Sequence, residues 1–354
     1  MIKNDNTSKK YMEENFMQGK SWNERMRALL EKRKWDMKDW RRAIKRDQRA
    51  LENLIDIDTT GLPQETLDRL YENTKEAKLD KKMLRFEQPV MIAVWAHKGG
   101  TGKSTTVANM SYELSVMGYN VLVIDTDSQS DVSSVLYPKY LQEPNVNFYE
   151  AFSIRDDFAA DGYVRSTEYD GLDIVPGSEK CEALEGIMSM MEERLRDKIW
   201  PKCLKRIREE NYYDFILVDM DKTAGVMNKS ILAQADYVLS PIEAASFSMK
   251  SLIPIMTQIE EMQGKGAKIK ILGVFFNKVD MRKKKSFAES VELVERLGEG
   301  KALQTYIKLD SNVEGSQKEY LPLGYYNRSC TASKQTIELT KEVLGRIAAD
   351  LEVV

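Results

Sequence analysis

Short apolar runs alternate with amphipathic stretches along the chain from Gln88 onward. Runs such as Phe215-Ile216-Leu217-Val218 contain no polar position, which is typical of strands buried on both faces of a parallel sheet. They predict strands over 90–96, 120–125, 172–175, 214–219, 236–240, 269–276 and 303–308. The intervening stretches predict helices over 104–117, 179–210 with a break near Pro201, 225–234, 247–263, 286–297 and 331–350. We therefore expect an α/β fold with a doubly wound, mostly parallel sheet that binds ligands at the carboxyl ends of its strands.

The N-terminal part of the chain has a different pattern, because helical spacing prevails there and no strand-like run occurs. Ser21 and Glu24 have the spacing of a capping box, so a first helix is expected to begin here and to end near Lys34. We predict two domains, an all-helical extension over residues 1–87 and an α/β domain over residues 88–354.

Two more helices are expected within the extension. Asp36 is suited to cap the second, whose apolar stripe would consist of Trp40, Ile44, Leu51 and Ile55. A third helix is expected from Pro63, a residue that favours the first helical turn, with a stripe of Leu67, Leu70 and Tyr71. The second and third helices can form a helix-turn-helix that reads an operator, but many three-helix segments serve only to form dimers.

Composition indicates a soluble protein with a sizeable core, since the 354 residues are 42% hydrophobic and 31% charged. The sequence has no run of about 18 apolar residues and no apolar signal-peptide core, so we expect a cytoplasmic protein without membrane contact. The scattered Cys181, Cys203 and Cys330 indicate reduced thiols that serve packing. The single histidine, His97, excludes catalytic schemes that need several.

Charge is spread unevenly, although the chain as a whole carries a net charge of only −3. Residues 1–85 hold 21 lysines and arginines against 16 acidic residues, so the rest of the chain is net negative. Most of the basic excess lies in residues 20–50. An anionic partner for the N-terminal part and an ordinary solvated helical face explain this cluster equally well.

The most specific motif is the octapeptide Lys98-Gly99-Gly100-Thr101-Gly102-Lys103-Ser104-Thr105, which lies between a predicted strand and a predicted helix. Glycines let backbone N–H groups surround a phosphate, and a helix N-terminus adds a favourable dipole. Lys103 would reach the β- and γ-phosphates, and the Ser104 hydroxyl would complete a magnesium shell. The first glycine of the usual phosphate-loop pattern is His97 here, and Lys98 is an additional lysine.

Carboxylates follow two of the predicted strands. Asp125 and Asp127 stand at the end of the strand over 120–125, and Asp219 ends the apolar strand over 214–219. Alone, each is also explained as an ordinary solvated acid at a strand end. Their order behind the glycine-rich loop favours a metal–phosphate site.

The K-G-G-T-G-K-S-T octapeptide resembles the deviant Walker A motif of the ParA/MinD family of ATPases. The resemblance covers about residues 88–350 and implies ATP and Mg²⁺ as cofactors. Asp127 would then orient the attacking water, and Asp125, Asp219 and Ser104 would support the magnesium ion. The nucleotide would be bound by Gly99, Gly100, Thr101, Gly102, Lys103, Ser104 and Thr105, with Asn277 at the base.

The sequence departs from this family at both switch segments. Ser128 replaces the usual proline after Asp127, and both prolines that normally follow the acid at position 219 are missing. Asp221 and Lys222 stand near their place, and we hypothesise that they form a charge pair that responds to the nucleotide.

By the same resemblance, Lys98 would reach across a homodimer interface to the nucleotide of the partner subunit. With Lys103 and Asp127 it would form the catalytic set, in the role that an arginine finger has elsewhere. ATP would join two subunits and hydrolysis would release them.

A helical extension of this size makes the chain similar to plasmid partition ATPases. That similarity implies weak hydrolysis, ATP-dependent binding to DNA without sequence preference, and release by a ParB-like centromere-binding protein, so we expect a cytoplasmic, nucleoid-associated protein. The candidate DNA contacts are Arg41, Arg42, Lys45, Arg46, Arg282, Lys283, Lys284 and Lys285, each of which is equally explained as solvated surface. A positioning ATPase for a protein cargo and a mainly regulatory DNA-binding protein share the same motifs. A membrane-positioning ATPase is disfavoured, because residues 347–354 form a short, acidic tail.

Overall fold

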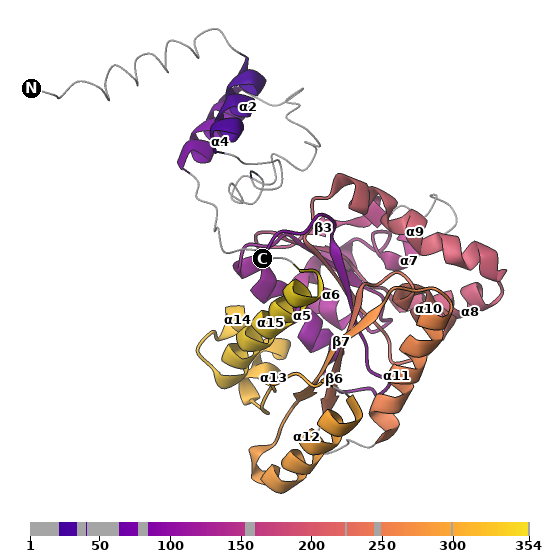
Figure 1. The fold of residues 1–354 in the computed structure, drawn as a ribbon. Helices are drawn as coiled ribbons and strands as arrows, with labels where there is room; N and C mark the ends of the chain where they lie inside the picture. The colour runs from indigo at the N-terminus through magenta and orange to yellow at the C-terminus, as the bar shows by residue number, and fades with distance from the viewer. Residues whose placement is uncertain are drawn as a thin grey trace, which may run out of the picture. The chain divides into compact units, whose positions relative to one another are not determined.

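The computed structural model describes residues 21–33, 40, 64–76, 84–152, 160–223, 225–243, 249–298 and 300–352. The chain divides into two compact units, residues 1–81 and residues 82–354, and each is described by itself (Figure 1). Apart from Trp40, the predicted second helix lies outside the described residues. So do its basic side chains Arg41, Arg42, Lys45 and Arg46.

The N-terminal unit contains α2 (Trp22–Arg33) and α4 (Gln64–Glu76). The capping box is confirmed, since the Ser21 N–H donates to Glu24 Oε2 at 2.8 Å and the Glu24 N–H donates to Ser21 Oγ at 3.3 Å. The predicted stripe of α4 is buried, and Trp40 Nε1 donates to Thr74 Oγ1 of that helix at 2.8 Å. These contacts give the unit a small apolar centre of its own.

The second unit is built on a sheet in the order β3-β4-β2-β5-β1-β6-β7. The strands are β1 (Val90–Val94), β2 (Val121–Asp125), β3 (Arg165–Ser166), β4 (Leu172–Val175), β5 (Phe215–Asp219), β6 (Tyr237–Glu243) and β7 (Lys270–Asn277). All neighbours pair in parallel except β3 and β4. The predicted doubly wound, mostly parallel sheet is therefore confirmed, and the short antiparallel β3 is an addition to the expected strands.

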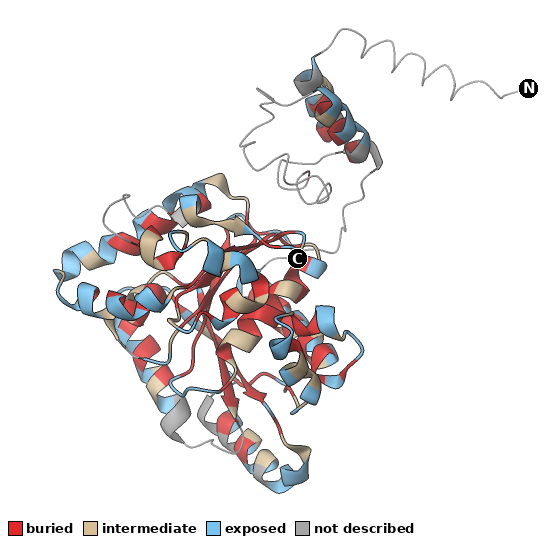
Figure 2. Ribbon diagram, turned by 180° about the vertical axis from the view of Figure 1, so that it is seen from behind, coloured by how far each residue is buried: buried red, intermediate tan, exposed pale blue. Residues whose placement is uncertain are grey.

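Helices cover both faces of this sheet (Figure 1). They are α5 (Lys103–Val116), α6 (Asp131–Leu136), α7 (Phe148–Ala151), α8 (Glu182–Ser189), α9 (Glu193–Glu210), α10 (Val226–Leu232), α11 (Met249–Gly264), α12 (Lys284–Gly298), α13 (Ser311–Lys318), α14 (Leu323–Tyr326) and α15 (Thr331–Asp350). One apolar core joins the sheet to α5 and α15, and a second joins it to α9, α10 and α11. Figure 2 shows buried residues concentrated along the strands between these layers. Among the described residues, no helix is long and apolar enough to cross a membrane.

Two expected elements differ in the structure. The helix break predicted at Pro201 falls instead between α8 and α9, and α9 continues through the proline. Burial of Trp200, Cys203 and Leu204 anchors both sides of Pro201, so packing outweighs the lost hydrogen bond. The segment predicted as a strand over 303–308 runs beside β7 and the residues after it, where the N–H groups of Leu303 and Ile307 donate to the carbonyls of Val274 and Phe276. It forms isolated bridges and no continuous ladder, so it is not a strand.

Candidate functional site

The glycine-rich segment between β1 and α5 curves around the N-terminus of α5. Gly100 (φ 78°) and Gly102 (φ 93°) adopt the left-handed backbone region, where residues with a side chain are strained. The helix begins directly after Gly102, whose carbonyl accepts from the Thr106 N–H at 2.9 Å and from Thr106 Oγ1 at 2.7 Å. The first N–H groups of a helix have no partners within it, so this turn is suited to bind an anion.

A cleft of about 690 Å³ opens beside this loop, at the carboxyl ends of the central strands. Its lining includes residues of the loop, of the segments after β2 and β5, and of α8: Gly99, Gly100, Gly102, Lys103, Ser104, Thr105, Asp127, Asp221, Lys222, Glu182 and Glu185. Most of the nucleotide-binding residues expected from the sequence thus face one cavity. Thr101 is buried and does not line it. Lys103 is only 8% exposed, so a mostly desolvated ammonium group faces the cleft.

Asp219 is a buried carboxylate beside the glycine-rich loop. Its oxygens Oδ1 and Oδ2 are both buried and have no hydrogen-bond partner among the described residues. Burial raises its pKa well above the usual value and the Asp125 charge adds to this, while Ser104 and Lys103 lower the pKa in part. Buried carboxylates are normally paired or bound to a metal, so Asp219 is suited to bind a cation.

Asp125 stands beside Asp219 across the β2–β5 pair but is fully hydrogen-bonded. Its Oδ2 accepts from the Ser133 N–H at 3.0 Å and from Ser133 Oγ at 2.6 Å, and its Oδ1 accepts from the Asp127 N–H at 3.2 Å. The Gly177 N–H donates in turn to Ser133 Oγ at 2.8 Å. Burial raises the pKa of Asp125 as well. Its contacts hold together β2, α6 and the segment after β4, so it positions the site.

Asp127, the proposed water-orienting residue, lies at the cleft itself. It is half-buried, and its Oδ1 accepts from the Gln129 N–H at 3.0 Å. This contact forms an Asx turn, in which the side chain accepts from the backbone two residues on. The turn therefore fixes the position of the Asp127 carboxylate at the cleft. The proline expected at Ser128 is thus not needed to shape the turn.

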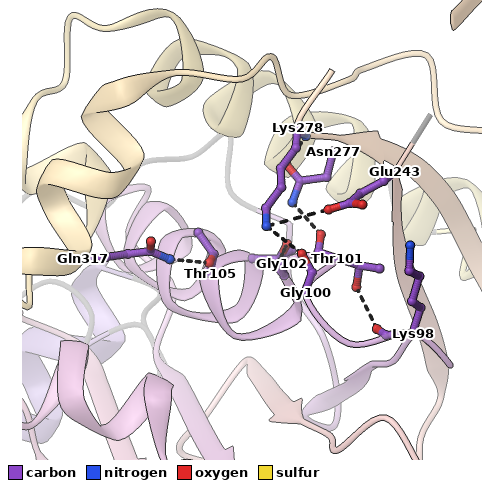
Figure 3. A network of polar contacts seen from close by, with 10 residues as sticks. Lys98, Gly100, Thr101, Gly102, Thr105, Glu243, Asn277, Lys278 and Gln317 are labelled. Carbon is purple, nitrogen blue, oxygen red and sulfur yellow. Dashed lines mark hydrogen bonds and ion pairs between the residues drawn. The ribbon is translucent and has the colours of Figure 1, made fainter. Parts of the chain in front are cut away.

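The end of β7 holds the outer side of the glycine-rich loop (Figure 3). Asn277 Nδ2 donates to the Thr101 carbonyl at 2.9 Å, and Lys278 Nζ donates to the Gly100 carbonyl at 2.6 Å. Gln317 of α13 reaches the same region, where its Nε2 donates to Thr105 Oγ1 at 2.9 Å. Asn277 also lines a second cavity of about 230 Å³, which shares Thr105, Lys278 and Gln317 with the cleft.

Comparison with known proteins agrees with this geometry. The sequence model of a family described as an AAA domain matches residues 90–271, which is about half of the chain. The chromosome partitioning protein ParA of Caulobacter vibrioides is 27% identical over 260 residues, which cover 72% of this chain and 94% of that protein. The chain belongs to the ParA-type family of AAA-domain ATPases.

Two solved structures resemble this ParA-type fold. Cobyrinic acid a,c-diamide synthase of Mycobacterium smegmatis, solved with an ATP analogue and magnesium, gives a TM-score of 0.63 at 20% identity and covers 74% of this chain and 96% of its own. A candidate plasmid partition protein of Borrelia burgdorferi, solved with AMPPNP, gives 0.58 at 21% identity and covers 74% and 99%. At these identities the likeness concerns the fold.

The loop after Asp219 departs from the ParA-type pattern in sequence, because its two prolines are absent. Asn228 Nδ2 of α10 donates to the carbonyls of Asp221 at 2.8 Å and Thr223 at 2.6 Å. Glu185 of α8 accepts from the N–H groups of Val226 and Met227 at 2.8 and 2.9 Å. Side chains from two helices therefore restrain the segment after Asp219 in place of proline rings.

The hypothesised Asp221–Lys222 charge pair is not present in this conformation. The Lys222 backbone N–H donates to Asp221 Oδ1 at 2.6 Å, and no ion pair joins the two side chains. Lys222 lies instead close to the glycine-rich loop, since a Cβ added to Gly99 would lie 3.7 Å from Lys222 Cδ. Its aliphatic stem thus covers the first glycine of the loop.

Lys98 is exposed at the edge of the loop, and no ion pair joins it to another described residue. Its carbonyl accepts from Thr101 Oγ1 at 3.5 Å, and Figure 3 shows its amine apart from the contacts made by Asn277 and Lys278. It does not line the cleft of its own subunit.

The basic cluster at the start of α12 is exposed. Lys283, Lys284 and Lys285 lie on the surface, whereas Arg282 makes a two-pronged contact with Asp280 through Nε at 2.8 Å and Nη2 at 2.7 Å. This contact lowers the pKa of Asp280 to about 2. Three lysines in this cluster thus remain as open candidates for an anionic partner.

Six residues that shape the site were not singled out from the sequence: Ser133, Gly177, Glu185, Asn228, Lys278 and Gln317. Lys278 had a signal, since it follows Asn277 in an N-K-x-D pattern. The others lie in segments outside the sequence motifs and meet the site only through the fold.

Proposed function

We propose that this ParA-type protein binds ATP with Mg²⁺ in the cleft and hydrolyses it. The observation that carries this proposal is the buried Asp219, whose two unpartnered oxygens lie beside Lys103 and Ser104 at a helix N-terminus. Ser104 and Asp219 have the oxygen donors that magnesium prefers, directly or through water, and Asp125 would support them through the fold. The bound ion would stabilise charge on the transferred phosphoryl group.

The chain's own groups divide the remaining work. The N–H groups of the loop and the Lys103 ammonium bind and orient the phosphates. Asp127 holds the attacking water at the mouth of the cleft. The second cavity would receive the base, because it is lined by apolar side chains such as Met110, Phe275 and Ile307 and shares Thr105, Lys278 and Gln317 with the phosphate cleft.

We further propose that ATP joins two subunits and that the dimer binds DNA without sequence preference. The exposed Lys98 supports this, because its side chain does not line the cleft of its own subunit and makes no ion pair with another described residue. Hydrolysis, stimulated by a ParB-like centromere-binding protein, would release the DNA and thereby segregate a replicon over the nucleoid. Relatives that carry partition in their names support this function.

The decisive test of the dimer is the variant Lys98→Ala. We expect stimulated hydrolysis to fall by about 10³-fold or more, as for loss of an arginine finger, while ATP binding is kept. Lys334→Ala, an exposed lysine on α15, is the matched control and should hydrolyse ATP normally. Normal turnover in Lys98→Ala, or a single subunit in sedimentation with saturating ATP and Mg²⁺, would exclude the dimer.

DNA binding is tested by gel shifts with random DNA and with DNA upstream of the protein's own operon, each with ATP, ADP or no nucleotide. Binding of random DNA with ATP alone is the expected result, and a steep loss with added salt should accompany it. A protein that binds no random DNA with ATP would contradict the partition function and leave ATP hydrolysis standing.

A further inference from the structure

Two consecutive residues at the end of β7 hold two consecutive carbonyls of the phosphate loop (Figure 3). Asn277 is 7% exposed and donates to the Thr101 carbonyl, and the next residue, Lys278, donates through its ammonium group to the Gly100 carbonyl. Both contacts lie on the side of the loop that faces β7. Strand and loop are far apart in the sequence, so the fold alone brings them together.

Peptide geometry gives these contacts a consequence for the cleft. A trans peptide is planar, and its C=O and N–H groups point in opposite directions. The Gly100 carbonyl shares its peptide with the Thr101 N–H, and the Thr101 carbonyl shares its peptide with the Gly102 N–H. Holding both carbonyls toward β7 therefore turns both N–H groups away from β7, and Gly102, which carries one of them, lines the phosphate cleft.

The surroundings show that this contact is tightly constrained. Lys278 has φ 53°, a left-handed conformation that is strained for a residue with a side chain. Its own N–H donates to Asn277 Oδ1 at 2.9 Å, and Glu243 Oε1 lies 3.8 Å from its Nζ. A Cβ on Gly102 would lie 2.3 Å from Asn277 Nδ2, so only glycine allows this approach. Backbone strain of this kind persists where neighbouring contacts enforce it.

We propose that Asn277 and Lys278 are positioning residues for phosphate binding, which fix the peptides of the loop before the nucleotide arrives. This inference rests on the proposed function and deepens it. It also assigns Asn277 a role other than the base recognition expected from the sequence, because one amide hydrogen and the amide oxygen already bind the loop and Lys278. N–H groups that are already oriented bind an anion more tightly, because binding then costs less conformational entropy in the loop.

The test compares ADP with inorganic pyrophosphate, both with Mg²⁺, as ligands of the full-length protein in calorimetry. Pyrophosphate has no base, so it reports on the loop alone. For Asn277→Ala we expect both affinities to fall by the same factor, about tenfold, as for loss of one buried hydrogen bond. A loss for ADP with unchanged pyrophosphate binding would assign Asn277 to the base and overturn the proposal.

Lys278 requires a control for its charge, because the side chain also lines the cleft. Lys278→Met should weaken both ligands about tenfold, and the loss should persist at about 1 M salt, where direct charge attraction is screened. Lys278→Arg keeps a donor and the charge and should restore most of the affinity. A loss that disappears at high salt, or an arginine variant as weak as the methionine variant, would count against the proposal.

Failure of this inference and failure of the proposed function give different results. Wild-type protein that binds neither ADP nor pyrophosphate would exclude the nucleotide site itself. Wild-type binding that Lys103→Ala abolishes and Asn277→Ala leaves unchanged would keep the site and exclude the positioning role. Thermal unfolding of each variant, followed in parallel, identifies any loss of affinity that comes from a disordered domain.

Discussion

The ends of β2 and β5 carry the same sequence signature and differ in physical state. Both strands are buried and apolar and end in an aspartate, and the two aspartates are direct neighbours in the sheet. Asp125 accepts three hydrogen bonds from Asp127 and Ser133. Asp219 accepts none within the described part of the chain, although both its oxygens are buried.

The difference in hydrogen bonding arises from the paths of the segments that follow Asp125 and Asp219. After Asp125, the chain turns into α6 and brings Ser133 back over the carboxylate, while Gly177 allows close approach from β4. After Asp219, the chain leaves along the cleft and its side-chain restraints come from α8 and α10, away from the carboxylate. The protein's own groups therefore satisfy Asp125, whereas the oxygens of Asp219 have no hydrogen-bond partner among the described residues.

The largest expected effect is that of Asp219→Asn on ATP hydrolysis. We expect the steady-state rate to fall by about 10³-fold, because the amide is a poor substitute for a carboxylate beside magnesium. The free energy of unfolding without nucleotide should stay the same or rise by about 1 kcal/mol, since a buried charge without a partner is removed. An Asp219→Asn variant that is less stable and still active would show that Asp219, like Asp125, serves the structure of the domain.

Asp125→Ala should show the opposite balance. Removing its carboxylate leaves the Ser133 hydroxyl, the buried Ser133 N–H and the part-buried Asp127 N–H without their acceptor, which costs about 3 kcal/mol. Calorimetry should then show a Tm lower by about 9 °C for a domain of this size. Ser133→Ala removes fewer of these contacts and should cost less. A fully stable but inactive Asp125→Ala protein would place Asp125 in the same role as Asp219.

Gly177→Ala tests the close packing around Asp125. An added Cβ would lie 2.9 Å from Asp125 Cγ and 2.8 Å from Ser130 Oγ, so we expect a loss of about 2 kcal/mol in chemical denaturation. Gly186→Ala on α8 is the matched control, because its Cβ would meet nothing within 4 Å. The control should gain up to about 1 kcal/mol from helix propensity. Equal behaviour of the two variants would show that this corner is loosely packed.

The smallest effect is expected for Glu185→Gln, which weakens the restraint on the segment after Asp219. We expect the free energy of unfolding to fall by about 1 kcal/mol. Amide exchange should become faster at Val226 and Met227, because their N–H groups donate to Glu185. Glu182→Gln lies on the same helix and also faces the cleft, so it serves as control. Unchanged exchange at both amides would show that the restraint lies elsewhere.

The main sheet, the phosphate loop and most helices were predictable from the sequence, because each rests on local patterns. Buried parallel strands need unbroken apolar runs, and a phosphate loop needs glycines before a helix. The prediction failed where packing outweighs local preference, as at Pro201 inside α9, whose flanking side chains are buried. It also failed for the segment over 303–308, because pairing depends on the neighbouring strand as well as on its own residues.

The sequence alone determined which residues could bind phosphate and which strands end in acids. Only the tertiary structure decided that Asp125 is satisfied by Ser133 and that Asp219 is not, and that Asn277 and Lys278 hold the carbonyls of the loop. Hydrogen-bond satisfaction depends on groups that lie far apart along the chain. No local pattern reports on them, and the packing of the sheet and its helices brings them within reach.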